Sequence, residues 1–244
     1  MTKQYYSKAP IKEAIIDLRV RPAKETDLAL LEKFGPEERQ RYPLRTDLKI
    51  AEGQMELGER FSSSTSMHQI GFMFHSADGK QIFQPQLAGF RFTRLAPYES
   101  WEPFRDEARR LWNLYRQLTK PQAVDRMALR YINRLDLPNP IPELKVFLRT
   151  GPEISPDLPQ MMDGYFMQLN IPQEDIRARL VLTETTVQPL TAGTVSIILD
   201  IDLFREGELP QDEQGLWGLL EVLQARMNKS FEGCITDRVR ELIR

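Results

Sequence analysis

The sequence predicts an α+β protein in which predominantly antiparallel strands pack on long amphipathic helices. Several segments alternate apolar and polar side chains, as half-buried strands do. Two longer segments repeat apolar side chains every three or four residues, which indicates helices with one buried face. Asp78 and Gly79 supply the backbone conformation of a tight hairpin and so favour antiparallel pairing of the strands beside them.

The first part of the chain predicts strands at residues 14–20, 48–57, 68–75 and 81–95. A helix is expected to start near Thr26 and Asp27, and the serine-rich residues 62–66 are expected to form a polar loop. Ser100 is the expected N-cap of a long helix that ends before Pro121, and a strand at 125–137 follows. The buried stripe of that helix is predicted to comprise Trp101, Phe104, Ala108, Leu111, Tyr115 and Leu118. Trp112 falls beside this stripe and is predicted to seal an interface between halves or subunits.

The second part of the chain repeats this order of strands followed by a long helix. Strands are predicted at 164–170, 177–187 and 194–204, followed by a helix at 212–231 that Gly233 breaks and a short turn that Thr236 caps. Prolines interrupt residues 138–159, which predicts a connection between an N-terminal half, 1–137, and a C-terminal part, 160–244. Two related lobes, one open sheet and one continuous domain would each satisfy this order.

Composition limits the classes of partner. A formal net charge of -2 gives no overall attraction to nucleic acid or to an anionic membrane. The single cysteine, Cys234, cannot form an intramolecular disulfide, and the N-terminus is polar, so we expect a cytoplasmic protein. Charged residues interrupt every apolar run before it reaches the length of a membrane span, so no membrane contact is expected.

Motifs of the common enzyme classes are missing from the sequence. It contains no glycine-rich phosphate loop, no dinucleotide fingerprint and no nucleophile elbow, so no catalytic residue and no cofactor is predicted. His68 and His75 would lie on opposite faces of a strand, and no further ligands complete a metal set. Asp200 and Asp202 would share one face of a strand and could hold a divalent ion, but an ordinary polar sheet face is the stronger interpretation, because the alternating apolar residues fully explain the strand.

Arginines supply the candidate binding site. Arg126, Arg130 and Arg134 recur every fourth residue on one face of the strand at 125–137, roughly 13 Å apart by strand rise. Arg91 and Arg177 lie on other predicted strands, and acidic residues including Glu184 lie in comparable positions. These five arginines are predicted to bind a protein partner or a small anionic ligand. The mixed signs argue against nucleic acid, and a sheet face held by cross-strand ion pairs is the alternative interpretation.

Two central segments resemble a known family. RFTRLAPYESWEPFRDEARRLW at 91–112 and LRYINRLDLP at 129–138 are similar to the signature of a sporadically distributed, uncharacterised family of prokaryotic proteins of similar length. YSKAPIKEAIIDLRV at 6–20 and FEGCITDRVRELI at 231–243 resemble its two ends. The resemblance implies no activity, cofactor or catalytic residue. A sporadic distribution is typical of accessory or defence-associated genes, which favours a role in protein binding.

Two hypotheses of function follow from the sequence. The first is a non-enzymatic binding or regulatory protein that uses an arginine-lined sheet face or a cleft between lobes. The alternative is an enzyme or ligand-binding protein that acts on a phosphorylated or carboxylated small molecule with a divalent metal. A homodimer formed through Trp112 or the terminal helix is compatible with either hypothesis.

Overall fold

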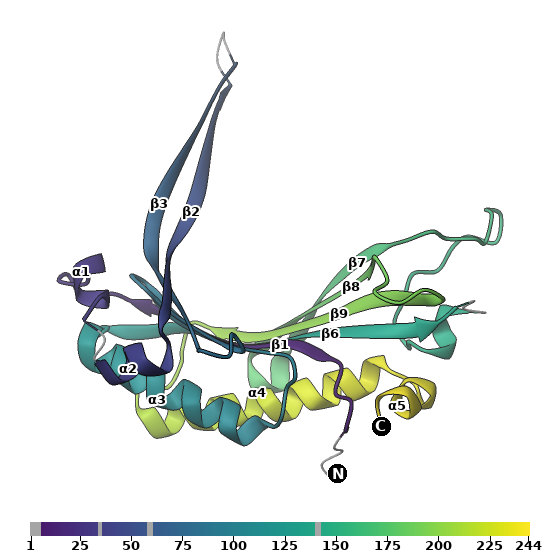
Figure 1. Cartoon of the computed structure of the whole chain (residues 1–244). Helices are drawn as coiled ribbons and strands as arrows, with labels where there is room; N and C mark the ends of the chain where they lie inside the picture. Colours follow the sequence, from purple (N-terminus) through teal and green to yellow (C-terminus); the bar gives the residue numbers. More distant parts are fainter. Residues whose placement is uncertain (1–5, 34–35, 58–60, 140–142) are drawn as a thin grey trace. The chain divides into compact units, whose positions relative to one another are not determined.

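The structure is a computed structural model in which residues 6–33, 36–57, 61–139 and 143–244 are described, with the backbone alone for 36–37, 52–57 and 61–65. Nine strands form one antiparallel sheet in the order β2-β3-β4-β5-β1-β6-β9-β8-β7, which confirms the α+β class (Figure 1). The chain divides into two compact units. Unit 1 comprises Met1–Ile16, Leu95–Glu99 and Arg126–Arg244, and unit 2 comprises Asp17–Arg94 and Ser100–Asp125. The sequential domain boundaries given above stay predictions.

Unit 2 contains a meander of four strands together with the second half of β1 (Ile11–Arg21). The predicted strand at 81–95 is wrong as one element, because a turn at Leu87 and Ala88 divides it into two strands. Gly89 permits the close approach of β1, since a Cβ atom there would lie 2.9 Å from the carbonyl oxygen of Leu18. The other elements of unit 2 are α1 (Leu28–Leu31), α2 (Pro36–Arg41), β2 (Leu44–Leu57), β3 (Phe61–His75), β4 (Gln81–Gln86), β5 (Gly89–Leu95) and α3 (Trp101–Thr119).

The hairpin of β2 and β3 corrects the prediction of a polar loop at residues 62–66. These residues belong to β3 and pair in register with Glu52 to Glu56 of β2. Strand β4 is much shorter than β3, so the far part of the hairpin is a ribbon of two strands alone (Figure 1). A polar run is compatible with a two-stranded ribbon as well as with a loop, so composition did not distinguish them.

Helix α3 buries most of the predicted stripe against the strands of unit 2. Leu118 is only half-buried, whereas Trp112 is fully buried. The Trp112 ring lies 5.7 Å from that of Phe90 in an edge-to-face arrangement. Its predicted role at an interface between halves or subunits is therefore wrong, because the ring belongs to the core of unit 2.

Unit 1 contains the antiparallel strands in the order β6-β9-β8-β7, with helix α4 along one face of β6 and β9 (Figure 1). Leu129, Leu199, Leu203 and Leu182 point to this face, and Leu223 of α4 is among the fully buried residues that meet them. The elements are β6 (Ala123–Pro138), η1 (Leu144–Val146), β7 (Phe166–Gln173), η2 (Glu174–Ile176), β8 (Ala178–Val187), β9 (Thr194–Glu206), α4 (Glu213–Cys234) and α5 (Asp237–Ile243).

The ends of α4 show what the sequence did and did not indicate. Asp212 caps the helix, and its carboxylate accepts a hydrogen bond of 2.8 Å from the backbone of Gly215. Gly233 does not break the helix as predicted, because α4 continues through Cys234. Thr236 occupies the N-cap of α5, but its hydroxyl donates to the carbonyl of Val146 instead of capping the helix.

Candidate functional site

Alternate residues of β6, β9 and β8 point away from α4 and form a charged face in unit 1. We define this charged face by Arg126, Arg130 and Arg134 of β6 and the acidic residues that pair with them. Directly opposite residues of antiparallel strands share a face, so Arg130 lies beside Asp202, which in turn lies beside Val181 of β8. The alternation predicted for residues 125–137 is therefore present.

Each arginine of the charged face has a carboxylate partner. Arg130 holds Asp200 with two parallel hydrogen bonds, one of them 2.8 Å from Nε to Oδ1. This bidentate hydrogen bonding raises the pKa of the Arg130 guanidinium. Both Asp200 oxygens therefore face an arginine and not a free space for a cation.

Arg134 and Arg126 also have carboxylate partners. Arg134 Nε lies 3.0 Å from Asp136 Oδ1, and Ser196 donates a short hydrogen bond to the same oxygen. Burial opposes ionisation of Asp136, but the hydrogen bonds from Ser196 and Arg134 outweigh it and lower the pKa of this carboxyl. Arg126 spans Glu206 and Asp202 at 3.3 and 3.5 Å, and its guanidinium lies 4.3 Å from the centre of the Phe204 ring.

A hollow of about 570 Å³ opens at one end of the charged face, where β8 begins and β9 ends. Arg177 precedes β8 with a left-handed backbone (φ 51°), so it lies in the turn and not on the predicted strand. Its nearest carboxylate is that of Glu208, 3.9 Å away, and both side chains are largely exposed. The hollow is lined by Pro172, Glu174, Arg177, Ala178, Arg179, Phe204 and Glu206.

Arg179 is the residue of this hollow that sequence reasoning did not select. It lies opposite Phe204 in the ladder and is exposed. Within the described ranges it makes no ion pair and no side-chain hydrogen bond. The available signal was its position two residues after Arg177. This position places Arg179 on β8, the strand beside the one that carries Asp200 and Asp202.

The predicted site residues are therefore divided. Unit 1 brings Arg126, Arg130 and Arg134 to one face and Arg177 to the end of that face. Arg91 belongs to unit 2, where its Nε and Nη2 atoms both lie 2.9 Å from Asp17 Oδ2. Glu184 was expected among these surface charges, and this expectation is wrong, because it points to the opposite, buried face of β8.

Glu184 is fully buried beneath α4, where it lies near Tyr165 and Cys234. The Tyr165 hydroxyl donates a hydrogen bond of 3.3 Å to Oε2, while Oε1 has no partner among the described residues. Burial raises the pKa of Glu184 to about 7, and the Tyr165 hydrogen bond opposes this only in part. Burial and the nearby Glu184 charge raise the pKa of the Cys234 thiol to about 11, so this thiol is no nucleophile at neutral pH.

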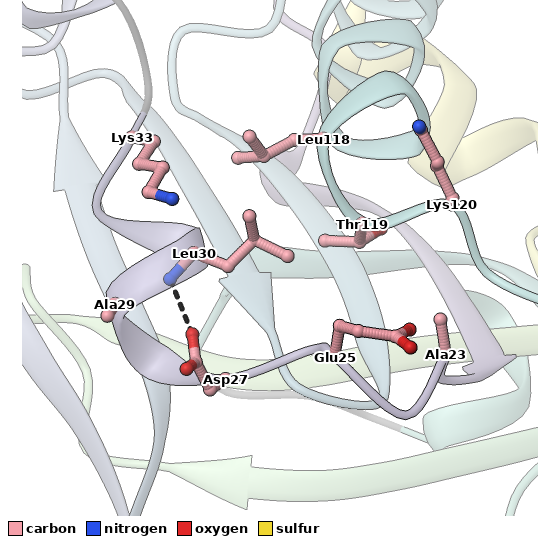
Figure 2. Close-up of a pocket in the computed structure, with 9 residues that line it drawn as sticks. All are labelled: Ala23, Glu25, Asp27, Ala29, Leu30, Lys33, Leu118, Thr119 and Lys120. Carbon is pink, nitrogen blue, oxygen red and sulfur yellow. Dashed lines mark hydrogen bonds between the residues drawn. The ribbon is translucent and has the colours of Figure 1, made fainter.

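Unit 2 has a second hollow of about 460 Å³ between the loop after β1, helix α1 and the end of α3 (Figure 2). Leu30 and Leu118 project into it, and Lys33, Lys120 and Glu25 bring charges of both signs to its edge. Asp27 accepts a hydrogen bond of 2.7 Å from the backbone of Leu30 and so serves as the cap of α1. Because these charges have both signs, they do not indicate one class of ligand.

Comparison with protein-family models, with curated proteins and with solved structures finds no match. The resemblance of residues 91–112 and 129–138 to a prokaryotic family therefore stays a prediction. Among the residues that the structure describes, no helix is long and apolar enough to cross a membrane, and no three acidic, histidine or cysteine side chains gather as metal ligands. The geometry of unit 1 is thus the basis for a proposal of function.

Proposed function

We propose that this is a non-enzymatic binding protein that holds an acidic segment of a protein partner in the hollow beside Phe204. The observation that carries the proposal is the difference between two sets of arginines on one face. Arg126, Arg130 and Arg134 have carboxylate partners within 3.5 Å, whereas Arg177 and Arg179 lie at the hollow with no such partner in the described part of the chain.

The paired arginines are poor direct ligands. An incoming anion would have to displace Asp200 from Arg130, and that would leave a half-buried carboxylate without its cation. We infer that the ion pairs hold the face rigid and fix Phe204 under Arg126. Binding energy would then come from Arg177 and Arg179, whose guanidinium groups can each grip a carboxylate or phosphate with two hydrogen bonds.

The surroundings of the hollow favour a protein segment over the other anionic ligands. It lies on the open face of a sheet, whereas small-molecule sites are usually enclosed and mostly apolar. Glu174 and Glu206 line it, and Glu208 lies beside it, so a continuous phosphate backbone would meet repulsion. A peptide can place single acidic side chains against the arginines and an apolar one against Phe204.

The sequence adds the wider setting of the proposal. We propose a cytoplasmic, accessory or defence-associated role, supported by the resemblance of the central segments and by the single cysteine. Two related lobes with long amphipathic helices are part of the same proposal, supported by the order of strands followed by a helix in β2 to α3 and again in β7 to α4.

The test uses a fluorescent peptide that alternates glutamate with leucine, and a control peptide with glutamine in place of glutamate. Anisotropy is expected to show binding of the glutamate peptide alone, weakened by added salt. Arg177→Glu and Arg179→Glu should each weaken binding about tenfold or more, the effect of losing one charge-assisted contact. Arg238→Glu, on the exposed surface of α5, is the matched control and should bind as the wild type.

Two results would contradict the proposal. One is equal binding of both peptides, and the other is equal loss of binding in Arg238→Glu and Arg177→Glu. Direct binding of succinate or inorganic phosphate, without any binding of the peptide, would instead favour a small anionic ligand at the same arginines.

A further inference from the structure

Strand β7 ends the sheet, and from Phe166 to Ile171 its outer edge has neither charged side chains nor proline, two features that usually protect such an edge. None of its eight residues, Phe166–Gln173, carries a charge. Phe166 is 70% exposed and Ile171 is 36% exposed. The opposite end strand, β2, carries Arg45, Asp47 and Lys49, and charges of this kind discourage edge-to-edge pairing.

The hydrogen-bonding direction of each β7 residue follows from its first contact with β8. The ladder begins with Phe166 opposite Thr185, and one residue before it the backbone N–H of Thr186 donates to the carbonyl of Tyr165 at 3.1 Å, so the register extends to this pair. Bonded and non-bonded pairs alternate in an antiparallel ladder, so the odd-numbered residues of β7 bond to β8. The even-numbered residues therefore direct their backbone N–H and C=O groups to the outer edge, where no backbone partner exists among the described residues.

Proline ends this open edge on one side. Pro172 is even-numbered and has no N–H, so it costs no bond to β8 and cannot donate outward. The outward donors are thus Phe166, Gln168 and Asn170, a set with Gln168 at its centre. In an antiparallel pair of two such strands, the outward N–H groups of one strand meet the outward C=O groups of the other.

We propose that β7 pairs antiparallel with β7 of a second copy of this chain, about a two-fold axis at Gln168. In this register three pairs exchange both of their backbone hydrogen bonds, and no outward N–H of the three is left unused. Directly opposite residues are Phe166 with Asn170 of the second copy, Gln168 with Gln168 of the second copy, and Met167 with Leu169 of the second copy.

The side chains agree with this register. Met167 and Leu169 are half-exposed on the face that α4 covers only in part, so facing each other across the axis would remove apolar surface from water. The two Gln168 amides can exchange hydrogen bonds. Each amide also donates to Thr183 of its own chain at 3.1 Å. Because no charge lies in the strand, the two-fold axis brings no like charges together.

Sedimentation velocity of the full chain over a range of concentrations up to about 100 µM should show a reversible dimer of micromolar affinity, as expected for a small interface. Gln168→Lys places two lysines against each other on the axis and should shift the sedimentation coefficient to that of the monomer. Gln214→Lys adds the same charge on exposed α4 and should leave the dimer intact. A wild type that is monomeric throughout, or a Gln168→Lys variant that stays dimeric, overturns the proposal.

Cross-linking gives a second measurement that does not depend on a disrupted interface. Bonded antiparallel pairs have Cα atoms about 5.5 Å apart, within the range of a disulfide. Gln168→Cys should therefore form a covalent dimer under mild oxidation, whereas Gln214→Cys should not. Equal cross-linking of the two variants, or none at Gln168→Cys, contradicts the register.

Discussion

The buried glutamate of unit 1 predicts a pH-dependent stability that one substitution should remove. Glu184 has an ordinary pKa of 4.5 in the unfolded chain and about 7 in the folded protein, because burial disfavours its charged form. Between these pH values unfolding releases a proton, so rising pH favours unfolding. The contribution of Glu184 to the free energy of unfolding is fully present below pH 4.5. It falls as the pH rises towards 7 and stays low above pH 7.

The magnitude follows from the two pKa values. They differ by about 2.5, and at roughly 1.4 kcal/mol per pKa unit the loss at pH 8 is about 3 kcal/mol. Glu184→Gln keeps the shape of the side chain and cannot ionise. Relative to the wild type, it should therefore gain about 3 kcal/mol in the free energy of unfolding between acid and pH 8. Any fixed effect of the amide cancels in this comparison.

Urea unfolding of both proteins at several pH values from 4 to 8 is the assay. Glu208→Gln is the control, since this side chain is 96% exposed and should leave the pH profile unchanged. Tyr165→Phe removes a hydrogen bond that lowers the pKa of Glu184, so it should steepen the loss of stability towards pH 8. Parallel pH profiles for wild type and Glu184→Gln would refute the reasoning.

Further substitutions test the packing, a helix cap and an ion pair. Leu223→Ala, on the buried face of α4, should cost about 3 kcal/mol of unfolding free energy in denaturant titration, while Val222→Ala, 43% exposed, should cost under about 1 kcal/mol. Asp27→Ala removes the cap of α1 and should cost about 1 kcal/mol, visible as faster amide exchange in that helix. Arg130→Ala leaves Asp200 unpaired and should cost about 1–3 kcal/mol, and Arg130→Ala/Asp200→Ala should restore part of it.

Local periodicity was sufficient for most elements, because it depends on which face of each segment is buried. Strand β6 and helices α3 and α4 follow from side chains two, three or four residues apart. The ends of strands and helices that depend on tertiary contacts could not be predicted from periodicity. The turn at Leu87 has no glycine or asparagine in its centre, and Gly233 stays helical because α4 continues to Cys234.

The function of the arginines depends on register, which periodicity does not specify. The four-residue spacing of Arg126, Arg130 and Arg134 predicts a common face, and unit 1 has it. Whether these guanidinium groups are open to a ligand depends on β9, whose alignment brings Asp200 and Asp202 alongside. A shift of one residue would have turned those carboxylates to the buried face and left the arginines open.

The same reasoning explains why Arg179 is the more informative residue. On β8 its register partner is Phe204 and not an aspartate, and Arg179 forms no ion pair with the residues that the structure describes. An unpaired guanidinium costs little at an exposed position, but it keeps its full capacity to bind an anion. Absence of a partner, more than the number of arginines in a row, therefore distinguishes a binding position from one that holds the sheet together, and substitutions at Arg179 and Arg130 should separate the two roles.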